Sequence, residues 1–187
     1  MGDDPEQEAR EALARGDREG ALAILVRAYG SALYRFCRQM VADPELAEDV
    51  HQTTFLQAFT GLESFGGQLL FKAWLFRIAR HRCLDALKIA RRREKRFLLF
   101  GELPETPHPG PEAAMSLDEQ DRTAALRGCL GELAPHVRTA VLLHYQEGFT
   151  FEQISRISRE RAPTLQARVA RSLPVLRRCL EARGFGS

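Results

Sequence analysis

Apolar residues along most of this chain recur at helical spacing. Phe71, Trp74, Leu75 and Ile78 fall at positions i, i+3, i+4 and i+7, so a helix would place them on one face. This stripe predicts the core of an amino-terminal domain, and packing in that core is the simplest role for Trp74. No segment alternates convincingly between apolar and polar residues, as a half-buried strand would. The pattern therefore predicts an all-α protein.

Residues that favour helix ends divide this pattern into elements. Asp4-Pro5 and Asp43-Pro44 each place an N-cap residue before a proline suited to the first helical position. The helix that begins at Pro44 is expected to run to about Gly61. These signals indicate where two of the amino-terminal helices start.

The carboxy-terminal part has the pattern of two helices separated by a tight turn. Residues 150–153 fit a capping box, which starts a short helix with Ile154 and Ile157 facing inward. After a few residues of turn, Pro163 opens a longer helix that is rich in arginine. Its apolar residues recur at steps of four: Leu165, Val169 and Leu173. This arrangement favours a helix-turn-helix, whose second helix enters the DNA major groove.

A proline-rich stretch separates the two helical parts. Four prolines lie within the eight positions 104–111, which forbids a helix and favours an extended, solvated linker. The chain is thus predicted to hold two small helical domains, residues 1–96 and 121–187, joined by a flexible acidic linker of residues 97–120.

The distribution of charge changes the meaning of the total. The whole chain carries a formal charge of only +2, which alone would argue against a polyanionic partner. Residues 72–96 carry +8 and residues 156–183 carry +6, whereas residues 1–20 carry −4 and residues 97–121 carry −6. Two basic helical blocks with an acidic stretch between them favour DNA binding at two separate places.

Other chemistry is sparse. The four cysteines are far apart in sequence and are expected to be buried thiols in a reducing compartment. No signal peptide and no apolar run of about 18 residues is present, so a cytoplasmic protein without direct membrane insertion is expected. His81 and Asp85 are four residues apart with no third metal ligand. No catalytic constellation or phosphate loop appears, which predicts no enzyme, cofactor, metal or small-molecule substrate.

Two segments resemble a known family. Residues 47–59, Phe65 and residues 71–85 resemble the second conserved region of bacterial RNA polymerase sigma factors, most closely the extracytoplasmic function group. The later helix-turn-helix resembles the fourth region of that family, and the resemblance covers roughly residues 20–183. It implies an alternative sigma factor that binds core RNA polymerase, recognises −35 and −10 promoter elements and helps to open the promoter. An anti-sigma factor is a further partner that the family implies.

The resemblance also assigns residues to partners. The helix of residues 43–61 presents a polar, acidic face suited to a basic helical partner, and in the family this face binds the clamp helices of the largest polymerase subunit. The fourth region is expected to meet the polymerase flap. The core-polymerase contacts are Glu45, Glu48, Asp49 and Gln52. The −10 contacts are Phe65, Gln68, Arg77, Arg80, His81, Lys88, Arg91 and Arg92. The −35 contacts are Thr164, Gln166, Arg168 and Arg171.

Three positions depart from the family pattern. His81 stands where asparagine is usual, Ser158 stands where the turn glycine is expected, and Pro174 would kink or end the second helix of the helix-turn-helix. These departures leave an alternative open, a sigma-like protein that acts only through protein interaction, such as a decoy that holds an anti-sigma factor. A simple dimeric helix-turn-helix repressor is a third possibility.

Overall fold

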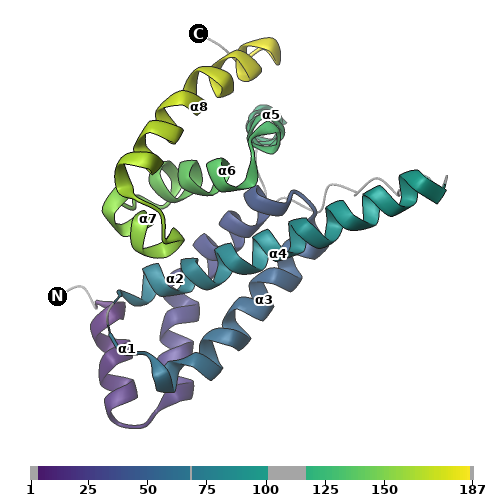
Figure 1. Ribbon diagram of the computed structural model, residues 1–187. Helices are drawn as coiled ribbons and strands as arrows, with labels where there is room; N and C mark the ends of the chain where they lie inside the picture. The colour runs from purple at the N-terminus through teal and green to yellow at the C-terminus, as the bar shows by residue number, and fades with distance from the viewer. Residues whose placement is uncertain (1–3, 68, 101–116, 186–187) are drawn as a thin grey trace. The chain divides into compact units, whose positions relative to one another are not determined.

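The computed structural model describes residues 4–67, 69–100 and 117–185, and every regular element within these ranges is helical (Figure 1). The prediction of an all-α protein is therefore confirmed. The chain divides into two compact units, the first containing α1–α4 and the second α5–α8. Within the described ranges, no helix is both long and apolar enough to cross a membrane.

The first unit contains four helices and one short turn. They are α1 (Pro5–Ala14), α2 (Arg18–Val41), α3 (Pro44–Gly61), a 3-10 turn (Leu62–Ser64) and α4 (Phe71–Phe100). Asp4 caps α1 as predicted, because its carboxylate accepts the Glu6 N–H at 3.0 Å. The predicted bounds of α3 are also confirmed.

The core of the first unit forms where α2 packs against α1 and α4. Phe36 and Phe76 are fully buried and meet edge to face, with ring centroids 5.4 Å apart. Phe71, Leu75 and Ile78 are buried, which confirms most of the predicted stripe. Trp74 is only half-buried, so its assignment to the closed core was wrong.

The second unit contains α5 (Leu117–Glu132), α6 (Pro135–Val141), a π-helical turn (Leu142–Gln146), α7 (Phe151–Ser158) and α8 (Ala162–Ala182). The linker was predicted to span residues 97–120. The helices extend into this range from both sides, because α4 continues to Phe100 and α5 begins at Leu117. Residues 101–116, with all four prolines, lie outside the described residues. The division into domains stays a prediction.

The helix-turn-helix forms as its sequence signals indicate. Thr150 Oγ1 accepts the Gln153 N–H at 3.2 Å and Gln153 Oε1 accepts the Thr150 N–H at 2.8 Å, which completes the capping box. Ile154 and Ile157 are fully buried, as predicted.

The buried face of α8 does not follow the predicted spacing. Leu165 and Val169 are buried, but Leu173 is 39% exposed and the stripe continues through Ser172 and Leu176. A helix has about 3.6 residues per turn, so repeated steps of four drift off the buried face. The expectation that Leu173 continues the apolar line was wrong.

Pro174 does not end α8, which continues to Ala182. A helical proline deprives the carbonyl four residues earlier of its donor, and here that carbonyl belongs to Ala170. Pro174 and Ala170 are both exposed, so water has access to the side of the helix where the bond is missing. Of the two expected effects of Pro174, a kink or an end, the end does not occur, and the proline lies on the solvent face of the helix.

The left-handed turn residue is Arg159, one position after the predicted Ser158. Arg159 has a φ of 60°, and its N–H donates to the Ser155 carbonyl at 2.8 Å. Ser158 remains inside α7, where its hydroxyl donates to the Ile154 carbonyl at 2.9 Å. The helix-turn-helix thus closes with a residue that carries a Cβ where glycine is favoured.

Arg159→Gly is expected to raise the free energy of unfolding of the second unit by about 1 kcal/mol, because glycine adopts a left-handed conformation without the Cβ penalty. Chemical denaturation followed by circular dichroism measures this change. Arg156→Gly is the matched control, since Arg156 is also an exposed arginine but lies inside α7. There glycine is expected to cost about 1 kcal/mol. Equal destabilisation by both substitutions would contradict the prediction.

The prediction of four thiols was wrong for one pair. Cys129 of α5 and Cys179 of α8 form a disulfide with their Cα atoms 5.7 Å apart, although 50 positions separate them in sequence. The packing of α5 against α8 creates this proximity, which no local spacing could indicate. Cys37 and Cys83 lie buried as thiols in the first unit, as expected.

Candidate functional site

The exposed face of α3 is acidic. Glu45, Glu48, Asp49 and Gln52 are all exposed, and Gln52 Nε2 donates to Glu48 Oε1 at 3.4 Å. The opposite face of α3 is anchored by buried residues, among them Val50. The structure therefore brings together all four predicted contacts on one solvent-facing surface. We call these four residues the acidic face.

An apolar groove lies beside the acidic face and was missed by the sequence analysis. It has a volume of about 550 Å³ and is formed by apolar side chains of α2 and α3 with charged residues at its edge. Leu56, four positions after Gln52, is 69% exposed at this groove. The apolar lining is Leu22, Ala23, Val26, Leu56 and Phe59. An apolar centre with a charged rim is typical of a protein interface.

His51 fixes α3 to α2 behind this surface. Its Nε2 lies 3.0 Å from the Gly30 carbonyl, and its ring meets those of Tyr34 and Phe55 edge to face. Burial lowers the pKa of His51 below its usual value, against the smaller opposing effects of the Gly30 hydrogen bond and of Glu48. The ring is therefore neutral at neutral pH and does not offset the charge of the acidic face.

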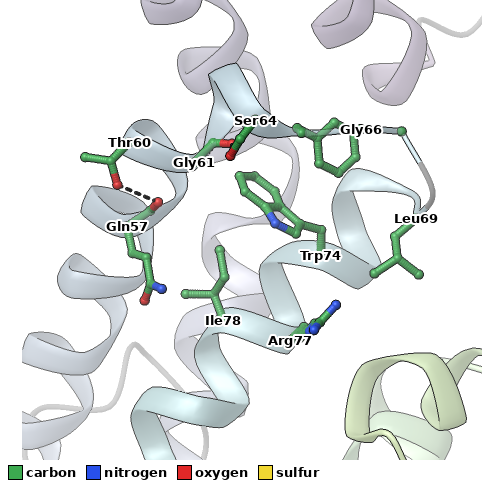
Figure 2. Close-up of a pocket in the computed structure, with 11 residues that line it drawn as sticks. Gln57, Thr60, Gly61, Ser64, Gly66, Leu69, Trp74, Arg77 and Ile78 are labelled. Atoms are coloured by element: carbon green, nitrogen blue, oxygen red, sulfur yellow. Dashed lines mark hydrogen bonds between the residues drawn. The ribbon is translucent and has the colours of Figure 1, made fainter.

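A pocket of about 470 Å³ lies where the end of α3, the following loop and the start of α4 meet (Figure 2). We call it the loop pocket. Figure 2 shows Trp74 of α4 projecting between the last turn of α3 and Ile78. Its lining is Gln57, Thr60, Gly61, Ser64, Phe65, Gly66, Gly67, Leu69, Trp74, Arg77 and Ile78.

Aromatic rings form one wall of the loop pocket. Phe65 stacks on Phe71 with centroids 4.2 Å apart and lies tilted against Trp74 at 5.0 Å. The indole fits beside Gly61, where a Cβ would lie 3.0 Å from Trp74 Cζ2. The Trp74 indole therefore packs against Gly61 and Phe65 and also lines the loop pocket. Gly61 lies thirteen positions before Trp74 on a different helix, so the periodicity of α4 does not reveal this contact.

Polar groups complete the loop pocket. Arg77 supplies a cation, and the Gln57 side chain is held by Arg82, whose Nε donates to Gln57 Oε1 at 2.7 Å. Aromatic surfaces beside hydrogen-bonding groups and a guanidinium suit an unstacked nucleobase on a phosphate backbone. Of the predicted −10 residues, Phe65 and Arg77 line this pocket, and Gln68 lies outside the described residues.

The remaining predicted −10 residues lie farther along α4. Arg80 is half-buried, and the rest are exposed: His81, Lys88, Arg91 and Arg92. Lys88 Nζ lies 3.6 Å from Asp85 Oδ1 on the same helix, an exposed pair of little energetic weight. The exposed side chains of α4 between His81 and Arg92 thus present a basic surface whose charge suits a phosphate backbone.

The predicted −35 residues differ in their exposure to solvent. Thr164, Gln166 and Arg171 are exposed on α8. Arg168 is half-buried, and its guanidinium lies 2.5 Å from the carboxylate of Glu160 in the preceding turn. Arg168 therefore links the turn to α8. The sequence predicted only a DNA contact for this residue and not this structural role.

Comparison with known proteins identifies the family of this chain. Residues 25–93 match Sigma-70 region 2, and residues 123–173 match Sigma-70 region 4. The chain is 30% identical to the RNA polymerase sigma factor NccH of Alcaligenes xylosoxydans xylosoxydans, covering 92% of this chain and 95% of that protein. It is 26% identical to the ECF RNA polymerase sigma factor SigW of Bacillus subtilis, covering 89% and 91%.

A solved structure is also similar, that of the sigma factor RpoE from Bartonella quintana in complex with the anti-sigma factor NepR. It is 27% identical with a TM-score of 0.67, covering 83% of this chain and 94% of that one. Matches to both of these sigma regions define the class of protein as a transcription initiation factor. The chain belongs to the sigma-70 family of RNA polymerase sigma factors, in its extracytoplasmic function group.

Proposed function

We propose that three surfaces of this sigma factor divide the work of initiation. The acidic face, with Leu56 at its edge, binds the clamp helices of the largest polymerase subunit. The loop pocket and the basic side of α4 hold the opened −10 strand, and the exposed residues of α8 read the −35 element. The second unit also meets the polymerase flap.

The loop pocket is the observation that carries this proposal. A sigma factor that opens DNA must compensate for lost base stacking, and an unpaired base regains stacking on an aromatic wall. Phe65 and Trp74 form such a wall, and Arg77 stands at its rim. Gly67, with a φ of 69°, lets the loop approach a nucleotide closely.

The −35 surface is proposed with one change from the sequence prediction. Thr164, Gln166 and Arg171 contact DNA, whereas Arg168 holds the turn through Glu160. The features that favoured a decoy protein do not disrupt the helix-turn-helix, because Arg159 closes the turn and α8 continues past Pro174. We therefore favour an active initiation factor.

An anti-sigma factor is the proposed regulator. The RpoE structure from Bartonella quintana contains the anti-sigma factor NepR, and this chain is similar to that sigma factor over most of its length. The apolar groove beside the acidic face gives such a protein a surface that overlaps the proposed polymerase contact. Binding of the anti-sigma factor would then exclude the polymerase.

Trp74→Ala tests the proposal at the loop pocket. Loss of the indole is expected to reduce run-off transcription from a duplex promoter by about tenfold or more, because stacking on an aromatic side chain is worth about 1–3 kcal/mol per base. The template is a promoter that the wild-type protein and core polymerase select from random-sequence DNA. Affinity for core polymerase is expected to stay unchanged.

Two matched variants accompany this test. Trp74→Phe keeps an aromatic wall and is expected to retain most activity, and Leu70→Ala removes an exposed side chain outside the pocket lining. Equal transcription by Trp74→Ala and wild type would contradict a role for the pocket. Binding of wild-type protein to core polymerase without any promoter-specific transcript would instead support the decoy.

A further inference from the structure

Glu6 of α1 caps the first turn of α4 from 65 positions away in sequence. Its Oε2 accepts the Phe71 N–H at 2.7 Å, and its Oε1 accepts the Lys72 N–H at 2.9 Å. The Tyr29 hydroxyl of α2 donates to the same Oε1 at 3.1 Å. The first N–H groups of a helix have no partner within the helix, and a carboxylate there also meets the positive end of the helix dipole.

The capping group is well shielded. The Glu6 side chain is only 13% exposed, so its hydrogen bonds compete little with water. Burial, reinforced by the nearby Glu6 carboxylate, raises the pKa of Tyr29, which therefore remains a hydrogen-bond donor at neutral pH. One carboxylate thus joins α1, α2 and the start of α4.

Arg10 lies one helical turn after Glu6 and contacts the loop as well as the helix. Its guanidinium carbon lies 5.5 Å from the centroid of the Phe71 ring, and its Nη2 lies 3.9 Å from Glu6 Oε2. Its Nη1 lies 3.4 Å from where a Cβ at Gly67 would be. Arg10 therefore lies over the ring of the first residue of α4 and occupies the space beside the loop glycine.

These contacts converge on the two sides of the loop pocket. Phe71, held by Glu6 and Arg10, stacks on Phe65 of the loop side. Trp74 follows Phe71 by one helical turn on the helix side. The direction in which α4 begins therefore sets the position of the indole relative to Phe65.

We propose that Glu6 and Arg10 are positioning residues for the nucleotide pocket of this sigma factor, holding the loop and the start of α4 at the spacing that an unpaired base requires. The inference rests on the proposed function of the loop pocket. Neither side chain lines the pocket, so Glu6 acts through Phe71, and Arg10 acts through Phe71 and the loop at Gly67. A binding site keeps its geometry only if such supporting contacts hold it.

Glu6→Gln tests this role with little change in shape. The amide keeps one acceptor oxygen, so one of the two capped N–H groups loses its partner, and the negative charge is gone. Holoenzyme of the full chain and core polymerase is titrated with fluorescent single strands of the selected −10 element. One strand is intact, and others carry an abasic site at each position in turn. The position whose loss weakens wild-type binding most marks the captured base.

Wild-type holoenzyme is expected to prefer the intact strand to this abasic strand by about tenfold or more, the value of one stacked base. Glu6→Gln is expected to reduce that preference to about twofold by weakening only the intact strand. Glu8→Gln is the matched control, because Glu8 lies on α1 but pairs with Arg27 at 3.5 Å. Its preference is expected to equal that of wild type.

The outcomes separate a positioning role from a structural one. A general loss of stability would weaken both strands equally and lower core-polymerase affinity, and that result would overturn the proposal. An unchanged preference in Glu6→Gln would overturn it too. If Glu6→Gln fails to fold, Arg10→Gln replaces it in the test because it leaves the carboxylate cap in place. Arg10→Gln is also expected to reduce the preference for the intact strand to about twofold. If wild type and Trp74→Ala show no preference for the intact strand, the pocket function itself fails and the positioning role falls with it.

Discussion

Reduction of the Cys129–Cys179 disulfide is expected to lower the free energy of unfolding of the second unit by about 4 kcal/mol, because opening the closed loop of 50 residues restores chain entropy to the unfolded state. Chemical denaturation with and without a thiol reductant measures the effect through circular dichroism. The double variant Cys129→Ser with Cys179→Ser is expected to unfold at one midpoint in both conditions.

A second control separates this disulfide from the other cysteines. Cys37→Ala changes a buried thiol of the first unit and is expected to keep the full response to reductant. An unchanged midpoint of the wild-type protein on reduction would refute the prediction. The affected helix is α8, which carries the proposed −35 contacts, so the same titration also tests how much that helix depends on α5.

Reversing the charge of the acidic face is expected to have the largest effect on partner binding. Glu48→Lys combined with Asp49→Lys replaces two exposed acids of α3, and affinity for core polymerase is expected to fall by about 100-fold or more, since like charges across an interface cost several kcal/mol. Fluorescence anisotropy of labelled protein titrated with core polymerase measures the change.

The control for this reversal is Glu11→Lys, which changes an exposed acid on α1. It alters the net charge in the same direction by half as much, so an effect of total charge alone would appear in it at about half the size. A comparable loss in Glu11→Lys, or full affinity in the double reversal, would show that the acidic face is not the polymerase contact. The difference between the variants is expected to shrink with added salt because exposed charges are screened.

Local signals predicted the features that depend on neighbouring residues. The bounds of α3 follow from an aspartate-proline start and a terminal glycine, and the capping box at Thr150 places the start of α7. The acidic face also follows, because residues three and four apart share a helix face. These features need no knowledge of what packs against the helix.

Features that depend on distant residues could not be predicted in this way. The Cys129–Cys179 pair, the cap from Glu6 and the space beside Gly61 each join segments far apart in sequence. Periodicity assigned Trp74 to the core because it counts only positions on one helix. The pocket exists because α3 ends in a glycine against that indole, which is a property of two elements together.

Two departures from local rules are accommodated by their surroundings. Pro174 was expected to kink or end α8, but the helix continues to Ala182, and the turn glycine was expected at Ser158, but the left-handed residue is Arg159. Pro174 is exposed, and the turn at Arg159 is held by its own N–H and by the Arg168–Glu160 pair. A proline inside a helix costs about 3 kcal/mol, and tertiary packing of the remaining residues can override that cost.

The position of Trp74 also gives the protein a built-in optical probe. The sequence contains one tryptophan, and its half-buried indole forms a wall of the loop pocket. Intrinsic emission excited at the indole band therefore originates at this one place, without any attached dye. A base stacked on the ring would quench that emission, so stopped-flow fluorescence with tryptophan-free partners could time the capture of the base separately from the synthesis of RNA.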